Sequence, residues 1–224
     1  MCQTARKSLK NHNTMTQSEL YKYVTAYFLA TMPAPKTELH YNTPFQLLVA
    51  VRLSAQCTDK RINIVTPALF ERFPDARAMY GVEFDELLPY IKSVSYPNSK
   101  CRDLLAMAKM IVDNFGGEVP TDIEGLQRLP GVGPKTANVV ASVLYGAKVI
   151  PVDTHVFRVS KRIGLTVNAK TPIQAEKQLE AGFDESIRNL AHHWLLLHGR
   201  YVCTARKPKC EECGLSEQCI IHNS

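Results

Sequence analysis

The sequence predicts an all-α protein, and three observations lead to that fold class. Apolar residues recur at helical spacing along most of the 224 residues, and no window has the alternation of a half-buried strand. Residues suited to starting or ending a helix punctuate this pattern often enough for about ten short helices. Hydrophobic residues make up 45% of the chain, so a buried core is expected.

The N-terminal part predicts a tail and two helices. Residues 1–15 are polar and are expected to form a disordered tail. Apolar residues on one face predict a helix from Ser18, which the proline-containing segment 32–35 ends. Thr43 can cap a helix over 45–56, and a proline suits its first position. This helix is apolar nearly all round, so we expect it to be central and buried.

The middle of the chain predicts four more helices before residue 130. Ser95–Ser99 is typical of a turn, Gly116 is typical of a helix end, and Thr121–Glu124 has the spacing of a capping box. These signals place the helices from Thr58 or Asp59 to about Pro74, over 84–91, over 100–115 and from Thr121 to Leu129.

The last part of the chain predicts three helices and an irregular end. Asp153 can cap a helix over 154–163, which Gly164 ends. The other two helices are predicted over 172–179 and 185–197. From Tyr201 onward the chain contains prolines, a glycine and cysteines without helical periodicity.

Charge and cysteine content narrow the class of protein. The formal net charge is +6 at pH 7, which favours a polyanion as partner without proving one. No apolar run is long enough to cross a bilayer and no secretion signal is visible, so a cytoplasmic protein without a membrane partner is expected. The odd number of cysteines, seven, argues against a simple disulfide framework.

The stretch Leu129–Thr136 joins two helices through a Pro-Gly-Val-Gly turn, the pattern of a helix-hairpin-helix. The backbone N–H groups of Gly131, Val132 and Gly133, beside a helix N-terminus, make a site suited to an anion such as a DNA phosphate. Such a turn holds the nucleic-acid backbone and does not read bases. The alternative is a tight helical corner with no ligand.

Lys135 falls at the second or third position of the helix after this turn. The positive end of the helix dipole disfavours a cation there, and together with burial it favours the neutral amine that Schiff-base chemistry needs. A lysine that binds phosphate explains the position equally well. Asp153, eighteen residues on, is explained by its capping role alone. The local sequence leaves both roles open.

Six motifs follow one another along the chain. They are Leu53–Gln56, Asn98–Lys100, Leu129–Val140, Val152–Arg158, His192–Arg200 and the four cysteines of the C-terminal segment. In these residues and this order, the sequence closely resembles the endonuclease III family of bifunctional DNA glycosylases, within the helix-hairpin-helix, Gly-Pro-Asp superfamily. The resemblance covers nearly the whole chain from about Ser18.

The resemblance implies a two-lobed helix-hairpin-helix glycosylase fold with a C-terminal iron–sulfur cluster loop. A six-helix barrel is expected over 37–147 and ends with the hairpin. Residues 16–36 and 148–224 are expected to form the other, terminal lobe. Lys135 and Asp153 then lie on opposite sides of the junction, where a substrate cleft is expected.

The resemblance also implies base excision repair of DNA. Lys135 would be the nucleophile that forms a Schiff base, and Asp153 the carboxylate that stabilises positive charge on the sugar. Release of an oxidised pyrimidine from duplex DNA, followed by a β-elimination nick 3′ to the abasic site, is expected. The damaged base has to leave the stack, which selects weakly paired bases. Damaged or abasic duplex DNA is the expected partner, a monomer the expected form and the nucleoid the expected location.

Four further residues are expected to contact DNA. In the family, residues at the positions of Gln56 and Tyr96 fill the gap left by the flipped nucleotide. The best-known members carry an aliphatic residue at the second position, so a surface tyrosine is the alternative for Tyr96. His155 can orient DNA or the protein itself, and Arg200 can contact a phosphate.

The C-terminal segment over 203–219 holds four cysteines. They are Cys203, Cys210, Cys213 and Cys219. Their spacing suits either tetrahedral zinc or a 4Fe-4S cluster and does not separate the two. The family's cluster loop has this spacing, so the resemblance implies a 4Fe-4S cluster with these four ligands. The basic residues Arg206, Lys207 and Lys209 can offset the cluster charge and contact phosphates.

Two rival functions fit part of the sequence. A monofunctional adenine glycosylase of the same superfamily lacks lysine at the position of Lys135 and carries an additional C-terminal domain. A non-catalytic helix-hairpin-helix DNA-binding module has no use for Lys135, Asp153 and a complete cluster loop together. The helical histidines at 192, 193 and 198 are expected to pack and donate hydrogen bonds, because the cysteines already complete a metal set.

Overall fold

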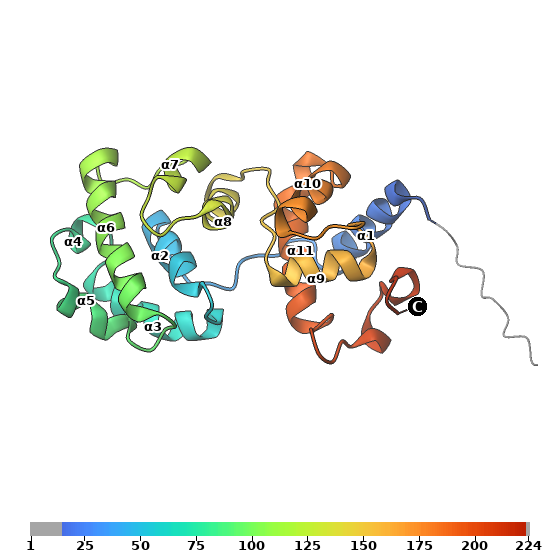
Figure 1. Cartoon of the computed structure of the whole chain (residues 1–224), viewed down its shortest axis with the longest axis horizontal. Coiled ribbons are helices and arrows are strands. Elements are labelled where there is room, and N and C mark those ends of the chain that lie inside the picture. Colours follow the sequence, from blue (N-terminus) through green and yellow to red (C-terminus); the bar gives the residue numbers. More distant parts are fainter. Residues whose placement is uncertain (1–14, 223–224) are drawn as a thin grey trace, which may run out of the picture.

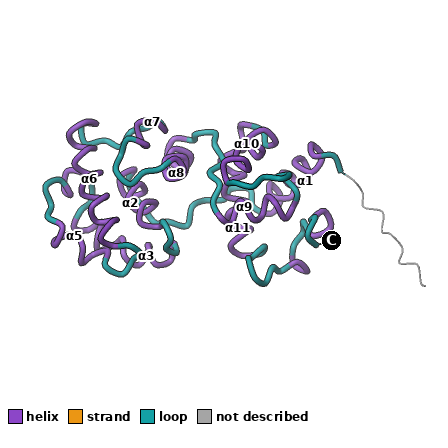
Figure 2. The backbone as a smooth tube through the Cα atoms, in the orientation of Figure 1, coloured by secondary structure: helices purple, strands orange, loops and turns teal. Residues whose placement is uncertain are grey.

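The computed structural model describes residues 15–222, and its regular structure there is entirely helical. Figure 2 shows helices joined by loops, with no strand in the described range, so the all-α prediction is confirmed. The predicted tail over 1–15 lies outside the described residues except for Met15. Within the described range, no helix combines the length and apolar character needed to cross a bilayer.

The helices follow one another with short connections. They are α1 (Gln17–Thr31), α2 (Pro44–Ser54), α3 (Asp59–Arg72), α4 (Ala76–Met79), α5 (Phe84–Ile91), α6 (Pro97–Phe115), α7 (Ile123–Gln127), α8 (Pro134–Tyr145), α9 (Thr154–Ile163), α10 (Pro172–Gly182) and α11 (Arg188–Tyr201), with 3-10 turns at Glu185–Ile187, Cys210–Glu212 and Ser216–Gln218.

Buried apolar side chains form two cores, and Figure 1 shows the helices as two lobes side by side. The middle lobe contains α2 to α8, around buried residues between 39 and 141. The terminal lobe combines α1 with α9 to α11 and the C-terminal segment. Trp194, fully buried in its core, stacks on Phe28 with 5.6 Å between ring centroids. The chain therefore crosses between the lobes twice.

Helix α2 lies at the centre of the middle lobe, as its apolar sequence predicts. The side chains from Phe45 to Val51 are all buried, and the helix packs against α3, α6 and α8. Thr43 Oγ1 accepts a hydrogen bond from the Gln46 N–H at 3.2 Å, and Pro44 occupies the first helical position. This helix brings the following loop to the junction between the lobes.

Helix α6 begins earlier than the sequence predicts. The expected turn over 95–99 stops at Tyr96, whose backbone is left-handed with φ 54°, and Pro97 starts the helix. Proline suits a first helical position because its φ is already helical and its missing N–H has no intrahelical partner to lose. Asn98 and Ser99 therefore lie on the first helical turn, not in a loop.

Two other local details differ from the prediction. Asp122, not Thr121, caps α7, and its Oδ1 accepts a hydrogen bond from the Gly125 N–H at 2.7 Å. Both residue types cap well, so the choice depends on where the chain turns into the helix. The short helix α4, capped by Asp75, escapes prediction because a single turn carries no apolar periodicity.

Side-chain contacts tie the lobes together at two places. Asn138 on α8 donates from Nδ2 to Glu176 Oε1 on α10 at 2.8 Å. Arg200 at the end of α11 donates from Nη1 to Asp59 Oδ2 at 2.6 Å and also pairs with Glu38. Polar side chains far apart in the chain therefore help to set the geometry of the junction.

Candidate active site and metal centre

The hairpin between α7 and α8 is anchored against the middle lobe. Val132 is buried in its core, and its N–H donates to the Leu129 carbonyl at 3.1 Å. Gly131 has φ 75°, and a side-chain carbon there would lie 2.8 Å from Asp103 Cβ on α6. Asp103 in turn pairs with Arg52 on α2. Only glycine therefore allows the turn to approach α2 and α6 this closely.

The start of α8 is open to an anion. Gly133 caps the helix without a side-chain hydrogen bond, and nothing lies within 4 Å of the position its Cβ would take. The first N–H groups of a helix have no partner within the helix, so they remain donors for a ligand. Of the three predicted turn residues, Gly131 and Gly133 are exposed, whereas the Val132 N–H already closes the turn.

Lys135 is the second residue of α8, as predicted, but its side chain is exposed. The expectation that burial contributes to its chemistry is therefore wrong. Pro134 before it and the turn glycines leave the helix start uncovered, so the lysine projects from the surface of the middle lobe. The position at the positive end of α8 remains the local feature that acts on the amine.

Asp153 caps α9 with one carboxylate oxygen. Its Oδ1 accepts hydrogen bonds from the N–H groups of His155 and Val156, both at 2.8 Å. Among the described residues, Oδ2 has no hydrogen-bond partner, and the side chain is only half-buried. The predicted capping role is confirmed, and one oxygen stays available for a second role.

A cleft of about 610 Å³ lies between the lobes and brings several predicted residues together. Its walls include Gln56 from the middle lobe and Asp153, His155 and Arg200 from the terminal lobe. Tyr96 is not part of the cleft wall, although its side chain is 66% exposed beside it on the loop before α6. Lys135 also lies outside the wall, on the neighbouring helix start.

His192 on α11 is buried and contacts the chain two residues before Asp153. Its Nδ1 lies 2.8 Å from the Pro151 carbonyl oxygen. Burial lowers the pKa of His192, as do the charges of His193 and Lys135, while the charge of Asp153 acts in the opposite direction. The charges of Lys135 and Asp153, which come from different lobes, therefore both act on this one imidazole.

His155 is oriented by Arg158, one turn further along α9. The Arg158 Nη2 atom lies 3.3 Å from His155 Nδ1 and donates to the Gly199 carbonyl at 2.7 Å. Its Nε donates to the Cys203 carbonyl at 3.1 Å. Arg158 therefore connects the N-terminal end of α9 to α11 and to the first cysteine, a role that local sequence patterns do not predict.

Arg200 lines the cleft, but its guanidinium already bonds to two carboxylates. Although burial acts against its charge, hydrogen bonds and charge interactions with Asp59 and Glu38 hold the pKa of Arg200 above its usual value. The Tyr201 hydroxyl donates to the same Glu38. A phosphate contact by Arg200, which stays a prediction, has to compete with these acceptors.

The four tail cysteines surround one pocket at the end of the terminal lobe. Cys203, Cys210, Cys213 and Cys219 all line it, with Ile163, His198 and Leu215 beneath. Burial raises the pKa of Cys213, and the charges of the other three cysteines add to this effect. Arg162 donates from Nη1 to Cys203 Sγ at 3.4 Å, and His198 Nε2 lies 3.6 Å from Cys213 Sγ.

The chemistry of these side chains suits an iron–sulfur cluster. Four cysteines line one pocket, and four cysteine thiolates are the usual ligands of a 4Fe-4S cluster. Donors from Arg162 and His198 can offset the negative charge on the sulfur atoms.

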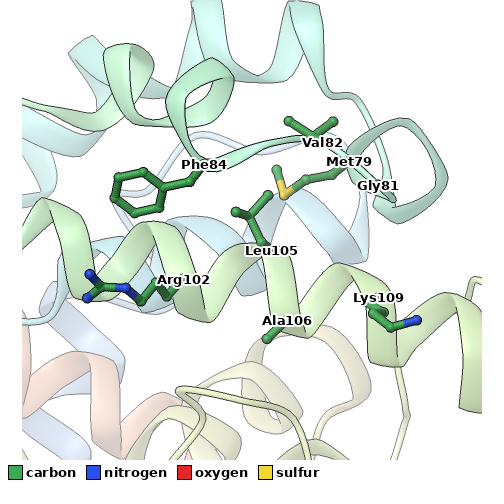
Figure 3. A pocket seen from close by; sticks show the side chains of 8 residues that line it. All are labelled: Met79, Gly81, Val82, Phe84, Arg102, Leu105, Ala106 and Lys109. Atoms are coloured by element: carbon green, nitrogen blue, oxygen red, sulfur yellow. The ribbon is translucent and has the colours of Figure 1, made fainter.

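A second hollow, shown in Figure 3, lies on the middle lobe away from these residues. Phe84 and Leu105 line its centre, with Arg102 and Lys109 at its two ends. The Arg102 guanidinium already lies 5.5 Å from the Phe84 ring centroid, and Lys109 pairs with Asp113 at 2.7 Å. None of the predicted site residues lines this hollow.

Comparisons with known proteins match the helical region and the C-terminal cysteine segment separately. Residues 49–185 match the model of the HhH-GPD superfamily of base excision DNA repair proteins, and residues 203–219 match the iron-sulfur binding domain of endonuclease III. The chain therefore has the 4Fe-4S cluster as its cofactor.

Relatives extend the match to nearly the full length. Endonuclease III of Rickettsia felis is 45% identical over 208 residues, which is 93% of this chain and 97% of the relative. Endonuclease III of Escherichia coli K12 is 41% identical over 187 residues, which is 84% of this chain and 88% of the relative.

Solved structures agree with the sequence comparison. A trapped endonuclease III–DNA covalent intermediate superposes with a TM-score of 0.87 at 38% identity, covering 94% of this chain and 98% of that one. A thermostable thymine-DNA glycosylase, at 22% identity and a TM-score of 0.78 over 92% and 96% of the two chains, shares the fold. The family model over most of the helical region, the cluster-domain match and the full-length relatives agree, and this chain belongs to the endonuclease III family of the HhH-GPD superfamily.

Proposed function

We propose that this protein repairs DNA by base excision, as a glycosylase that also nicks the strand. It releases an oxidised pyrimidine from duplex DNA and then cleaves the backbone 3′ to the abasic site. The observation that supports this proposal is that Asp153 lines a cleft between the lobes and Lys135 stands exposed at the start of α8, in a chain that belongs to the endonuclease III family. A glycosylase relative without the lysine could release a base but could not form the imine.

The reaction uses Asp153 and Lys135 one after the other. The Asp153 carboxylate stabilises positive charge on the sugar as the bond to the base weakens. Its Oδ2, which has no partner among the described residues, accepts a proton from Lys135. The neutral amine forms a bond to the anomeric carbon, and the base leaves with the bonding electron pair. The bond between the anomeric carbon and the ring oxygen then breaks as that oxygen takes up a proton, which opens the sugar ring and leaves a protonated imine to Lys135. Removal of the proton on the neighbouring C2′ carbon expels the 3′ phosphate by β-elimination.

The exposed surfaces around the cleft hold the DNA. The hairpin glycines and the open start of α8 bind a backbone phosphate. Gln56 and Tyr96 enter the gap left by the extruded nucleotide, and an aromatic ring at the second position can stack on the orphan base. His155 and Arg200 contribute from the terminal lobe side of the cleft.

The four cysteines would hold the 4Fe-4S cluster through their thiolates. When bound, the cluster supplies cross-links that fold the loop over 203–219, where the surrounding thiols alone repel one another once ionised. The folded loop presents Arg206, Lys207 and Lys209, all exposed, to the phosphate backbone. Visible absorption of the purified protein distinguishes this cluster from zinc.

All of the proposed site residues come from one chain, so a monomer suffices for the reaction. We place the protein in the cytoplasm, on the nucleoid, because its substrate is chromosomal DNA and its net charge of +6 favours a polyanion.

Borohydride trapping tests the proposal. Wild-type protein incubated with a duplex containing thymine glycol is expected to form a reduced covalent protein–DNA adduct, because borohydride converts the imine to a stable amine. Lys135→Gln is expected to abolish the adduct, whereas the matched change at exposed Lys170 keeps it. A wild-type protein that nicks this DNA but never traps would show that the nucleophile is not an amine.

A further inference from the structure

Lys100 is the most unusual buried side chain outside the cleft. It lies on the first turn of α6 and is only 1% exposed, among the apolar side chains of the middle lobe. Lysine is almost never fully buried unless its ammonium is paired. Its burial therefore calls for acceptors that satisfy the charge.

The acceptors are backbone carbonyls and one hydroxyl. Lys100 Nζ donates to the carbonyl oxygens of Leu53 and Ala55, both at 2.7 Å, and to Ser95 Oγ at 3.4 Å. An ammonium group has three donors, so these three contacts saturate it. The two carbonyls belong to the C-terminal end of α2, where helical carbonyls lack partners and a cation is favoured.

Ser95 carries the contact on to the loop after α2. Its Oγ donates to the Gln56 carbonyl oxygen at 2.7 Å while it accepts from Lys100. The chain Lys100–Ser95–Gln56 thus joins the loop before α6 to the loop between α2 and α3. These loops carry the two residues, Tyr96 and Gln56, that are expected to enter the DNA.

Both of those residues have a strained backbone. Gln56 has φ 55° and Tyr96 has φ 54°, and in the described part of the chain only Asn168 is another non-glycine residue with positive φ. Left-handed conformations of such residues persist only where the surroundings hold them, and they concentrate at functional sites. The side chains of Gln56 and Tyr96 themselves are exposed, so packing of those side chains does not hold them.

We propose that Lys100 is a positioning residue that locks Gln56 and Tyr96 into one rigid unit, so that both side chains enter the duplex together at a lesion. The inference rests on the proposed base-excision function and adds to it. An apolar residue of the same volume would fill the space under the loops, but it would leave the three acceptors without a donor. The ammonium therefore serves the geometry of the loops and not the filling of the core.

Ser95→Ala is the decisive variant, because it breaks the contact to Gln56 and leaves Lys100 bonded to Leu53 and Ala55. Single-turnover release of thymine glycol is measured from a duplex with adenine opposite, and from one with an abasic analogue opposite. The variant should slow release from the paired duplex about fivefold, the loss expected for one hydrogen bond. It should match wild type on the second duplex, which is already unstacked. Ser18→Ala, the same change on exposed α1, should match wild type on both.

A double-mutant cycle tests whether Ser95 acts through Gln56. In a Gln56→Ala background, Ser95→Ala should change the paired-duplex rate less than about twofold, because the positioned side chain is already gone. Lys100→Met should reproduce the selective loss more strongly, and folding of that variant is checked by helical circular dichroism before its rates are compared.

Three outcomes overturn the inference. Equal slowing of both duplexes by Ser95→Ala, no slowing of either, or an undiminished effect in the Gln56→Ala background would each show that the contact does not position the probing residues. A wild-type protein that releases no base from either duplex would instead defeat the proposed function, and this inference with it.

Discussion

At the scale of single residues, Asp153 combines two roles because its oxygens are in different environments. Oδ1 accepts from two backbone N–H groups at 2.8 Å and so holds the start of α9. Oδ2 has no partner among residues 15–222, and the side chain lines the cleft. The two hydrogen bonds that cap α9 thus also fix the orientation of the carboxylate in the cleft, and no further contact is needed.

Asp153→Asn should separate these two roles. Asparagine caps a helix about as well as aspartate, so the free energy of unfolding should change by less than about 0.5 kcal/mol and lesion binding should be retained. Loss of the negative charge should slow base release by about a hundredfold or more. Asp75→Asn, the same change at the cap of α4, should leave the rate unaltered. A variant that unfolds would mean that Asp153 serves mainly as a cap.

At the scale of elements, ion pairs from the end of α11 connect the two lobes. Arg200 bonds to Asp59 at the start of α3 and to Glu38 in the connection from α1 to α2. The side chains of Arg200 and Asp59 are 23% and 14% exposed, so water screens this pair less than a surface pair. The cluster loop begins at Cys203, three residues after Arg200, so folding of the loop is coupled to the contacts between the lobes.

Arg200→Gln should therefore affect stability more than DNA binding. Loss of charge-assisted hydrogen bonds to two carboxylates should lower the free energy of unfolding by about 1–3 kcal/mol, measured by urea denaturation. Arg206→Gln, at an exposed site in the loop, should change it by less than about 0.5 kcal/mol. If Arg200 instead contacts a phosphate, its loss should reduce the salt dependence of DNA binding and leave stability unchanged.

At the scale of the whole molecule, α11 carries buried neutral histidines into the terminal core. His192 and His193 are 4% and 7% exposed. Burial lowers the pKa of both from the usual value of 6.5, and carbonyl contacts to Pro151 and Asn189 only partly oppose this. As the pH falls, His192 and His193 therefore become protonated in the unfolded chain before they do in the folded chain. Above the pKa of the unfolded chain these two histidines do not reduce the free energy of unfolding, and below it they reduce it progressively.

The free energy of unfolding should accordingly fall as pH is lowered from about 7.5 to about 5. His193→Gln should make this pH dependence shallower, because one group with a lowered pKa is removed. His40→Gln, at an exposed position of the middle lobe, should leave the slope unchanged. Urea denaturation at each pH gives the slope, and visible absorption followed in parallel identifies any loss of the cluster. A slope identical in His193→Gln and wild type would contradict the assignment to α11.

Local patterns in the sequence predicted most of the helices, the family and the cofactor. The caps at Thr43 and Asp153 and the apolar run of α2 predict their helices correctly, because the interactions involved span only a few residues. The hairpin and the four cysteines are equally local motifs, and together with the other motifs they carry the resemblance that indicates the family and its cofactor.

Only the tertiary structure decided which groups meet. Arg200, for which the sequence predicts a phosphate contact, also bonds to Glu38, 162 residues away in the chain. Lys135 was expected to be buried and is exposed, while Lys100, to which no role was assigned, is buried beneath the α2–α3 loop. The left-handed backbone of Tyr96 moves the start of α6 to Pro97. Periodicity records the neighbours of a residue along the chain, whereas burial and hydrogen bonding here depend on helices packed from opposite ends of the sequence.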